Sequence, residues 1–361
     1  MRRSLITTLA TFSCALALGA AFAQTPQSTP ASASADPSIA PPGWKAPRNE
    51  FGQPDLCGFW SNATTTPVTR NPRVSTGPTL THEEAQKLEA TIAEAFALRD
   101  VSSDPNTLPG SAEDDAKFAR LGAVRPDVIG AGGKVGGYNS FWLDPGSQFV
   151  RINGEYRTSI LTTPDGQLPP RKDGQKSDAR QYDEENAINL GSYESYETRP
   201  LGERCLAFGR NAPPPMLPNG FYNNNYQIVQ TADFAVIHIE QIHDVRVVRL
   251  NGQHRTDGVR PWQGDSIGRY EGDALVVETT NMPQKQNFFG GWRKLKVTER
   301  FTRVSPARIV YSFQVEEPDV WEKPWGGEYT FHPLGAPIYE NACHEGNYSL
   351  PGILRGGQVK G

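Results

Sequence analysis

The sequence lacks the features that mark several large classes of protein. Its formal net charge is −4, from 36 Lys and Arg against 40 Asp and Glu, so it has no electrostatic footprint for nucleic acid or anionic lipid. Beyond the first 23 residues it has no apolar run long enough for a stable membrane span. It contains no HExxH or CxxC motif and no glycine-rich nucleotide loop, so no motif implies a cofactor.

The N-terminus has the pattern of a secretory signal peptide over residues 1–23. Arg2 and Arg3 form a basic start, an apolar stretch runs over residues 5–20, and the A-x-A triplet at 21–23 is typical of a cleavage site. Residues 24–42 are rich in Pro, Ser, Ala and Thr, which predicts a disordered leader. We therefore expect export to the periplasm or the extracellular space, with residues 43–361 forming a single β-rich domain.

Helical periodicity is clearest over residues 82–98. Thr81 and Glu84 form a capping box, and apolar residues follow at helical spacing at Ala85, Leu88, Ile92 and Phe96. A second, short helix is expected near residues 112–121. Asn153 and Gly154 separate two β-prone runs, 149–152 and 155–163, which predicts a hairpin.

Short strands account for most of the remaining chain. They are expected at residues 138–144, 226–231, 234–241, 244–250, 268–271, 274–281, 295–303, 309–317, 327–332 and 338–344. Residues 166–218 form a long, strand-poor insertion with prolines at 213–215, and such insertions are often lids or partner surfaces. Consecutive strands with little helix between them predict a mainly β fold, an antiparallel up-and-down barrel or a sandwich. Gly58-Phe59-Trp60 resembles the G-x-W opening of lipocalin-type barrels.

Acidic residues stand on otherwise apolar strand faces. By alternation, one face of a strand carries Leu295, Val297, Glu299 and Phe301, and the next carries Ile309, Tyr311, Phe313, Val315 and Glu317. A carboxylate on a buried face costs several kcal/mol unless it is paired, hydrogen-bonded or metal-bound. These positions therefore predict a polar site in the interior.

Two histidine-containing segments are candidates for chemistry. In residues 237–246, His238 and Glu240 share one strand face while His243 lies on the other, so they converge only if the chain turns or bulges near Gln241. In residues 339–348, Glu340 and His344 share a face, an arrangement that suits general acid–base catalysis.

The candidate catalytic set is therefore His243, His344, Glu299 and Glu340. A divalent metal bound by His243 and His344, with Glu299 or Glu345 as the carboxylate, is the metal alternative. The ordinary structural alternative is a solvent-facing or hydrogen-bonded histidine and an exposed ion pair.

The candidate ligand-binding residues are Glu240, Arg246, Arg204, Asn225 and Trp142. Arg204 and Arg246 are the cations best placed to balance buried acids, and an arginine binds an anionic group in a bidentate manner. Asn225 ends a run of three amides that opens a strand, and such amides either line a ligand site or cap a turn. Trp142 is expected in the core or in a cavity wall.

Four cysteines are present, and the expected signal peptide contains Cys14. An exported protein meets an oxidising compartment, so Cys57, Cys205 and Cys343 predict one disulfide and one free thiol. Spacing does not choose among the three pairings.

Several segments resemble a large family of exported, functionally uncharacterised bacterial proteins. They are the G-x-P-D-L-x-G-x-W opening at 52–60, Y-N-N-N-Y-Q-I-V-Q at 222–230, G-D-A-L-V-V-E-T-T-N at 272–281 and A-C-H-E-G-N-Y at 342–348. The resemblance implies export and a β-rich fold but no activity. It also implies a disulfide between Cys205 and Cys343, because the family carries both cysteines and usually has serine at the position of Cys57.

Three functional hypotheses remain open. The first is a barrel that binds a small, largely apolar or amphipathic molecule in its interior. The second is a periplasmic lyase, isomerase or hydrolase that uses a histidine and a carboxylate there. The third is a structural or interaction module whose interior acids form only ion pairs. A small-molecule ligand or substrate is the partner expected under the first two.

Overall fold

The computed structural model of the chain describes residues 36–37, 39–99, 143–174, 193, 195–207, 213–220 and 222–359. The chain divides into residues 1–35 and 36–361, and every described residue belongs to the second unit. Several expected features lie outside the described residues: the signal peptide, residues 24–35 and 38 of the leader, the helix at 112–121, the first part of the strand at 138–144, and Trp142. None of the described helices is long and apolar enough to form a transmembrane segment.

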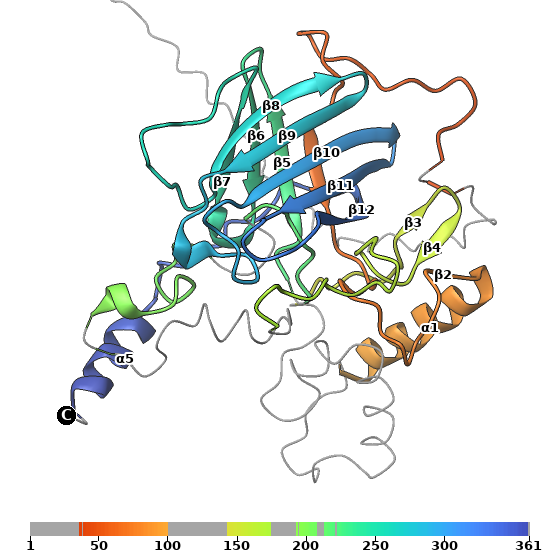
Figure 1. Cartoon of the computed structure of the whole chain (residues 1–361). Coiled ribbons are helices and arrows are strands. Elements are labelled where there is room, and N and C mark those ends of the chain that lie inside the picture. Colours follow the sequence, from red (N-terminus) through yellow and green to blue (C-terminus); the bar gives the residue numbers. More distant parts are fainter. Residues whose placement is uncertain are drawn as a thin grey trace, which may run out of the picture. The chain divides into compact units, whose positions relative to one another are not determined.

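Within the described ranges, nine strands close a barrel in the order β1-β12-β11-β10-β9-β8-β7-β6-β5 (Figure 1). Their bounds are Gly58–Ser61 (β1), Asn225–Gln230 (β5), Phe234–Ile239 (β6), Val245–Leu250 (β7), Asp265–Glu271 (β8), Ala274–Thr280 (β9), Lys296–Ser305 (β10), Arg308–Glu316 (β11) and Trp325–Pro333 (β12). The predicted mainly β barrel is thus confirmed, and the G-x-W triplet lies in β1, the strand that joins β5 to β12.

The sequence predicted an antiparallel barrel, but one pair of neighbouring strands is parallel. β7 and β8 pair in parallel, with Val248 opposite Ser266, whereas the other neighbouring strands are antiparallel. A closed ring with an odd number of strands cannot alternate direction at every step, so at least one pair must be parallel. A parallel pair needs a long crossover connection, and residues 251–264 provide it.

Alternating burial along the strands shows which side chains face the barrel interior. In β10 the buried residues are Val297, Glu299, Phe301 and Ser305, and in β11 they are Ile309, Tyr311, Phe313 and Val315. The neighbouring side chains on the opposite face are only partly buried or exposed. The interior is therefore a packed core that one acid, Glu299, shares with apolar and aromatic residues.

A smaller sheet and the first helix form a second hydrophobic cluster. The sheet has the order β2-β4-β3, with bounds Thr79–Leu80 (β2), Arg151–Ile152 (β3) and Glu155–Arg157 (β4). Helix α1 (His82–Arg99) begins at the predicted capping box, where the N–H of Glu84 donates to Oγ1 of Thr81 at 3.2 Å and the N–H of Thr81 donates to Oε2 of Glu84 at 2.8 Å. The predicted helix and the predicted hairpin around Asn153 are therefore confirmed, with shorter strands.

The expected strand at 338–344 is wrong. These residues have no regular structure, and they are followed by a second helix that the sequence did not predict, α5 (Ser349–Gln358). The physical reason is closure of the barrel: the free edge of β12 is already taken by β1, with Trp60 opposite Pro333. No edge of β12 remains for a further strand.

Candidate functional site

A buried ion pair lies at the centre of the polar interior. Arg246 in β7 and Glu299 in β10 are 1% and 0% exposed at their side chains. Nη1 of Arg246 donates to Oε1 of Glu299 at 3.0 Å, and Nη2 donates to Oε2. The guanidinium also donates to Oγ of Ser266 at 3.1 Å and to Oγ1 of Thr279 at 2.9 Å. This bidentate pair gives each of the two buried side chains a hydrogen-bonded partner inside the barrel.

Two tyrosines extend the polar interior from Glu299 to a chain segment outside the barrel strands. The hydroxyl of Tyr311 donates to Oε1 of Glu299 at 2.8 Å and accepts from the N–H of Met216 at 3.0 Å. The hydroxyl of Tyr329 donates to the carbonyl oxygen of Met216 at 2.8 Å. Tyr311 and Tyr329 are register partners on β11 and β12, so the closeness of their hydroxyls follows from strand pairing.

Asn62 ends this polar chain immediately after β1. Its Nδ2 donates to the hydroxyl of Tyr226 at 3.1 Å and to that of Tyr329 at 3.2 Å. The residue is 0% exposed, and among the described residues its Oδ1 has no hydrogen-bond partner. A buried carbonyl without a donor is uncommon, because leaving one unsatisfied costs about 1–3 kcal/mol.

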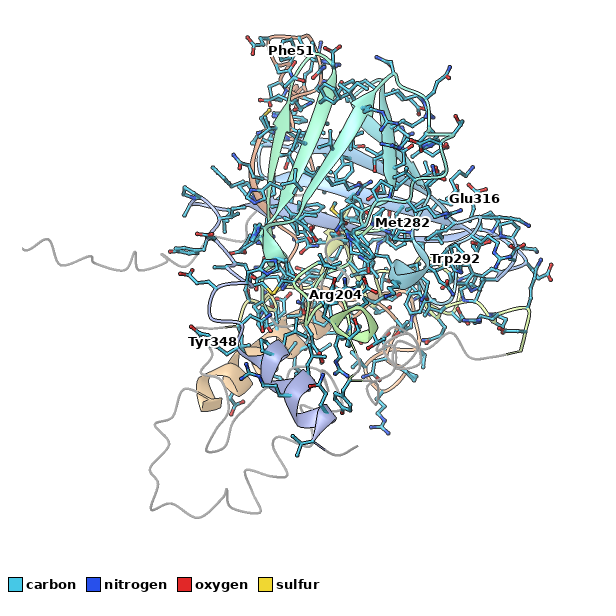
Figure 2. The ribbon with its side chains drawn as sticks, turned by 90° about the vertical axis from the view of Figure 1, so that its left-hand side faces the viewer. Phe51, Arg204, Met282, Trp292, Glu316 and Tyr348 are labelled. Carbon is cyan, nitrogen blue, oxygen red and sulfur yellow. A yellow bond between two sulfur atoms is a disulfide. The ribbon has the colours of Figure 1, made fainter. Side chains whose placement is uncertain are left out.

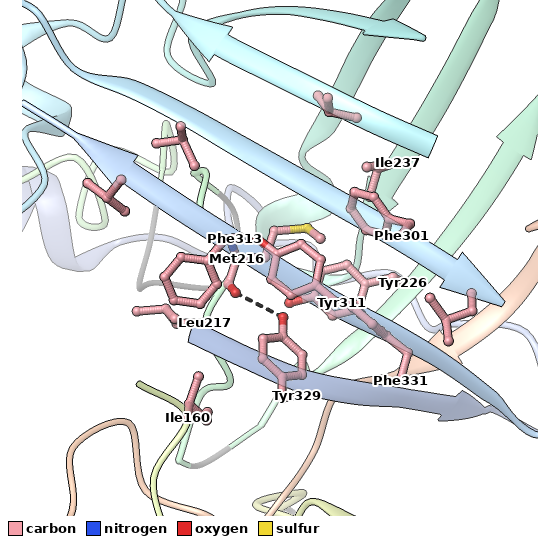
Figure 3. Packing of buried hydrophobic residues seen from close by; sticks show 14 of the residues in the cluster. Ile160, Met216, Leu217, Tyr226, Ile237, Phe301, Tyr311, Phe313, Tyr329 and Phe331 are labelled. Atoms are coloured by element: carbon pink, nitrogen blue, oxygen red, sulfur yellow. Dashed lines mark hydrogen bonds between the residues drawn. The ribbon is translucent and has the colours of Figure 1, made fainter. Parts of the chain in front are cut away.

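Met216 and Leu217 lie among the aromatic side chains of the barrel. Residues 213–217 are all buried, and Met216 and Leu217 belong to the same core cluster as Tyr226, Tyr311 and Tyr329. Figure 3 shows Met216 beside the rings of Phe313 and Tyr311, with a dashed line from its carbonyl oxygen to the hydroxyl of Tyr329. The rings pack closely, with centroids 4.9 Å apart for Tyr311 and Tyr329. The insertion at 166–218 thus places one of its segments inside the barrel.

The chain turns after β6, where the sequence required a turn for its polar residues to converge. Residues 241–243 form a short 3₁₀ turn in which Ile242 and His243 have positive φ angles of 57° and 45°. The turn brings Glu240 to Asn225, whose Nδ2 donates to Oε2 of Glu240 at 2.6 Å. Burial raises the pKa of Glu240, and burial together with the charge of Glu240 raises that of Asp144 to about 6.

The other ionisable residues near this turn are His238, His243 and Asp244, and they are exposed or only partly buried. His243 is exposed, and its Nδ1 lies 3.0 Å from the carbonyl oxygen of Asn341. Burial lowers the pKa of His238, with a smaller effect of His243. Asp244 accepts from Nε2 of Gln263 at 2.8 Å, and burial raises its pKa to about 6. The exposed ion pair that the sequence offered as an alternative would join Asp244 to Arg246, and it is not formed, because Arg246 is buried and bound to Glu299.

The second predicted histidine segment lies at the surface. His344, Glu340 and Glu345 are exposed, whereas Glu299 is fully buried. The structure therefore does not bring His344 or His243 to Glu299. Across the described part of the chain, no group of three or more His, Cys, Asp and Glu side chains is arranged to hold a metal ion.

The disulfide implied by the resemblance is present. Cys205 and Cys343 are bonded across 138 residues, with their Cα atoms 5.7 Å apart, and Cys57 is an exposed free thiol. Arg204, labelled in Figure 2, follows Glu203 and precedes Cys205 in the sequence. Its guanidinium carbon lies over the ring of Tyr196, 5.5 Å from the ring centroid. Arg204 and Arg246 therefore lie in different regions. Of the two, Arg246 is the one that pairs with a buried acid, Glu299, among the described residues.

Ser266 lies in a sequence motif that resembles the nucleophile motif of serine hydrolases. Residues 264–268 read Gly-Asp-Ser-Ile-Gly and so match the G-x-S-x-G spacing of serine-hydrolase nucleophiles. That chemistry needs an exposed serine on a sharp turn between a strand and a helix. Ser266 is instead 2% exposed within β8 and is bonded to Arg246 and Thr279. The match to the motif is therefore coincidental in this fold.

Sequence reasoning did not identify Asn62, Tyr311, Tyr329 or Met216 as site residues. The only local signal for Met216 was its position after three prolines, and the only one for Tyr311 was its place on the face that carries Glu317. Comparison of the chain with protein-family models, with curated proteins and with solved structures found no match.

Proposed function

We propose that the barrel binds a small, largely apolar or amphipathic molecule in its interior. One observation carries this proposal: inside the aromatic core, the hydroxyl of Tyr311 binds the backbone N–H of Met216 and the hydroxyl of Tyr329 binds its backbone carbonyl. An interior that receives a polar group flanked by apolar surface has the chemistry of an amphipathic ligand site, which is mainly apolar with a few placed polar groups.

The polar groups of this site would orient the ligand. Arg246 and Glu299 fix the hydroxyl of Tyr311, and Asn62 fixes the hydroxyl of Tyr329. Aromatic and aliphatic side chains around them would bury the apolar body, at roughly 25 cal/mol per Å² of apolar surface. Glu240, at the turn after β6, and Asn225, the first residue of β5, are not assigned to this site.

We also propose that the protein acts after export. The signal-like N-terminus and the family resemblance support this, and the disulfide between Cys205 and Cys343 suits an oxidising compartment. The lyase, isomerase or hydrolase alternative has no comparable support, because Glu299 is engaged by Arg246 and Tyr311 and the candidate histidines His243 and His344 are exposed.

Titration with the amphipathic dye anilinonaphthalene sulfonate tests the proposal. Val248 and Val247 are neighbours on β7, 0% and 48% exposed respectively. We expect saturable dye binding by the parent, about tenfold weaker binding by Val248→Phe because the larger side chain fills the interior, and unchanged binding by Val247→Phe. Thermal melting verifies that both variants are folded. Absence of saturable binding, or equal losses in both variants, would reject the proposal.

A further inference from the structure

Two arginines lie over the ring of one tryptophan where two loops of the barrel meet. Arg260 belongs to the crossover loop at residues 251–264, whereas Trp292 and Arg293 belong to the connection between β9 and β10. The guanidinium carbon of Arg260 lies 5.1 Å from the centroid of the Trp292 ring, and that of Arg293 lies 5.3 Å from it. Two positive charges from separate loops are thus brought to one indole.

Backbone hydrogen bonds hold the guanidinium of Arg260 at this place. Its Nη1 donates to the carbonyl oxygens of Met282 at 2.7 Å and of Trp292 at 3.3 Å, and its Nη2 donates to that of Arg293 at 3.3 Å. Met282 and Trp292 are labelled in Figure 2. A guanidinium has five N–H donors, so the Nε–H and one N–H of Nη2 remain for another acceptor.

Neither arginine forms an ion pair with a carboxylate in the part of the chain that the structure describes. Other cations of the same two loops are paired, Arg255 with Asp257 and Lys294 with Asp319. The carbonyls around Arg260 fix its position but carry no formal charge, and the indole attracts cations without neutralising them. Because like charges repel, two unneutralised guanidinium groups at one ring favour the binding of an anion there.

We propose that Arg260 and Arg293 bind an oxyanion beside Trp292, the phosphate, sulfate or carboxylate group of a ligand. Guanidinium groups bind such anions through short, charge-assisted hydrogen bonds, often two at a time. Arg260, held by the backbone and partly buried, sets the direction of the site, and the exposed Arg293 supplies the second charge. The site uses two loops and none of the interior tyrosines, so it does not rest on the proposed function.

Calorimetric titration of the full chain with inorganic phosphate at low salt tests the site. The variant is Arg293→Gln and the matched control is Arg269→Gln, since Arg269 is also exposed but is paired with Glu271. Both substitutions change the net charge by the same amount. We expect saturable binding by the parent, binding at least about tenfold weaker by Arg293→Gln, and unchanged binding by Arg269→Gln. No saturable binding by the parent, or equal losses in the two variants, would overturn the proposal.

Replacement of Arg260 separates the geometry of the guanidinium from its charge. Arg260→Lys keeps the charge but loses the planar fork of donors, so we expect phosphate to bind it more weakly than the parent and more tightly than Arg260→Gln. Phosphate binding by Arg260→Gln as tight as that of the parent would contradict the site. Thermal melting shows whether these variants fold, and the exposed Arg293 decides the proposal if they do not.

A parallel titration with phenyl phosphate distinguishes the source of the oxyanion. Tighter binding of phenyl phosphate than of inorganic phosphate would identify an organic ligand whose apolar part packs beside Trp292. Equal binding of the two would identify a free inorganic anion. Either result supports the site, provided that Arg293→Gln weakens the binding of both probes. Binding of either probe that Arg293→Gln leaves unchanged would place that probe elsewhere and refute the assignment.

Discussion

Replacing one partner of the Arg246–Glu299 pair is expected to affect stability differently from replacing both. Removing one partner leaves a buried charge unpaired, which costs about 3–5 kcal/mol, whereas replacing both by apolar residues is often nearly neutral. We therefore expect Arg246→Met to lower the free energy of unfolding by about 3–5 kcal/mol, and Arg246→Met with Glu299→Met to recover most of that loss. Urea unfolding measures both. A double variant as unstable as the single one would contradict this account of the pair.

The sequence predicted that Glu299 is a buried acid in need of a partner and named Arg204 and Arg246 as the candidate cations, but it did not choose between them. Alternation along one strand is local and places Glu299 on the apolar face. Its pairing with Arg246 depends on the curvature that brings β7 and β10 across the barrel, and such a nonlocal relation leaves no trace in either strand. The same holds for Asn62 and Tyr226, which meet only because β1 and β5 close the ring.

Asp144 predicts a pH dependence of stability. Burial first, and then the charge of Glu240, raises its pKa to about 6 from the ordinary value of 3.8. Its stabilising contribution is therefore complete below about pH 4 and is lost as the pH rises through 6. We expect Asp144→Asn to stabilise the protein by about 1–2 kcal/mol at pH 8 and to have little effect at pH 4. Equal effects in melting experiments at the two pH values would reject this.

At the scale of elements, the crossover between β7 and β8 is anchored by Asp265. This buried carboxylate accepts from Arg249 at 2.7 Å, from the N–H of Arg255 at 2.8 Å and from His254 at 3.0 Å. Burial would raise its pKa, but these hydrogen bonds lower it to about 2. Nε2 of His254 lies 3.1 Å from Glu278 in β9, so the loop is tied to two strands.

Loss of this anchor is expected to loosen residues 251–264 before the rest of the barrel. In Asp265→Ala, the N–H groups that donate to this carboxylate lose their partner. We therefore expect faster hydrogen exchange across the loop and a loss of about 1–3 kcal/mol in stability. Asp257→Ala is the control, since Asp257 is exposed in the same loop. Unchanged exchange in Asp265→Ala would show that the anchor is not needed.

Strand positions were largely readable from the sequence, but strand partners were not. Turn residues at Asn251 and Gly272 separated the predicted strands correctly. The parallel pairing of β7 with β8 was missed, because an exposed loop of ordinary composition gives no sign that it crosses over. The prediction of a strand at 338–344 was wrong for the opposite reason. Its local pattern suits a strand, but the closed ring offers it no partner.

At the scale of the molecule, the disulfide joins the insertion at 166–218 to the C-terminal segment. Cys205 and Cys343 are 138 residues apart, and a crosslink over so long a loop restricts the unfolded chain strongly. We expect Cys205→Ser with Cys343→Ser to lower stability by about 2–5 kcal/mol in urea unfolding, and Cys57→Ser, at an exposed free thiol, to change it by less than about 0.5 kcal/mol. Similar losses in the two proteins would contradict a structural role for the disulfide.

A crystal structure of the full chain grown with anilinonaphthalene sulfonate tests the central claim, that the barrel interior is a ligand site, most directly. We predict that the dye lies among the interior side chains, near the hydroxyls of Tyr311 and Tyr329. Dye bound only on the outer face of the barrel, with Met216 still bonded to both tyrosines, would contradict the claim.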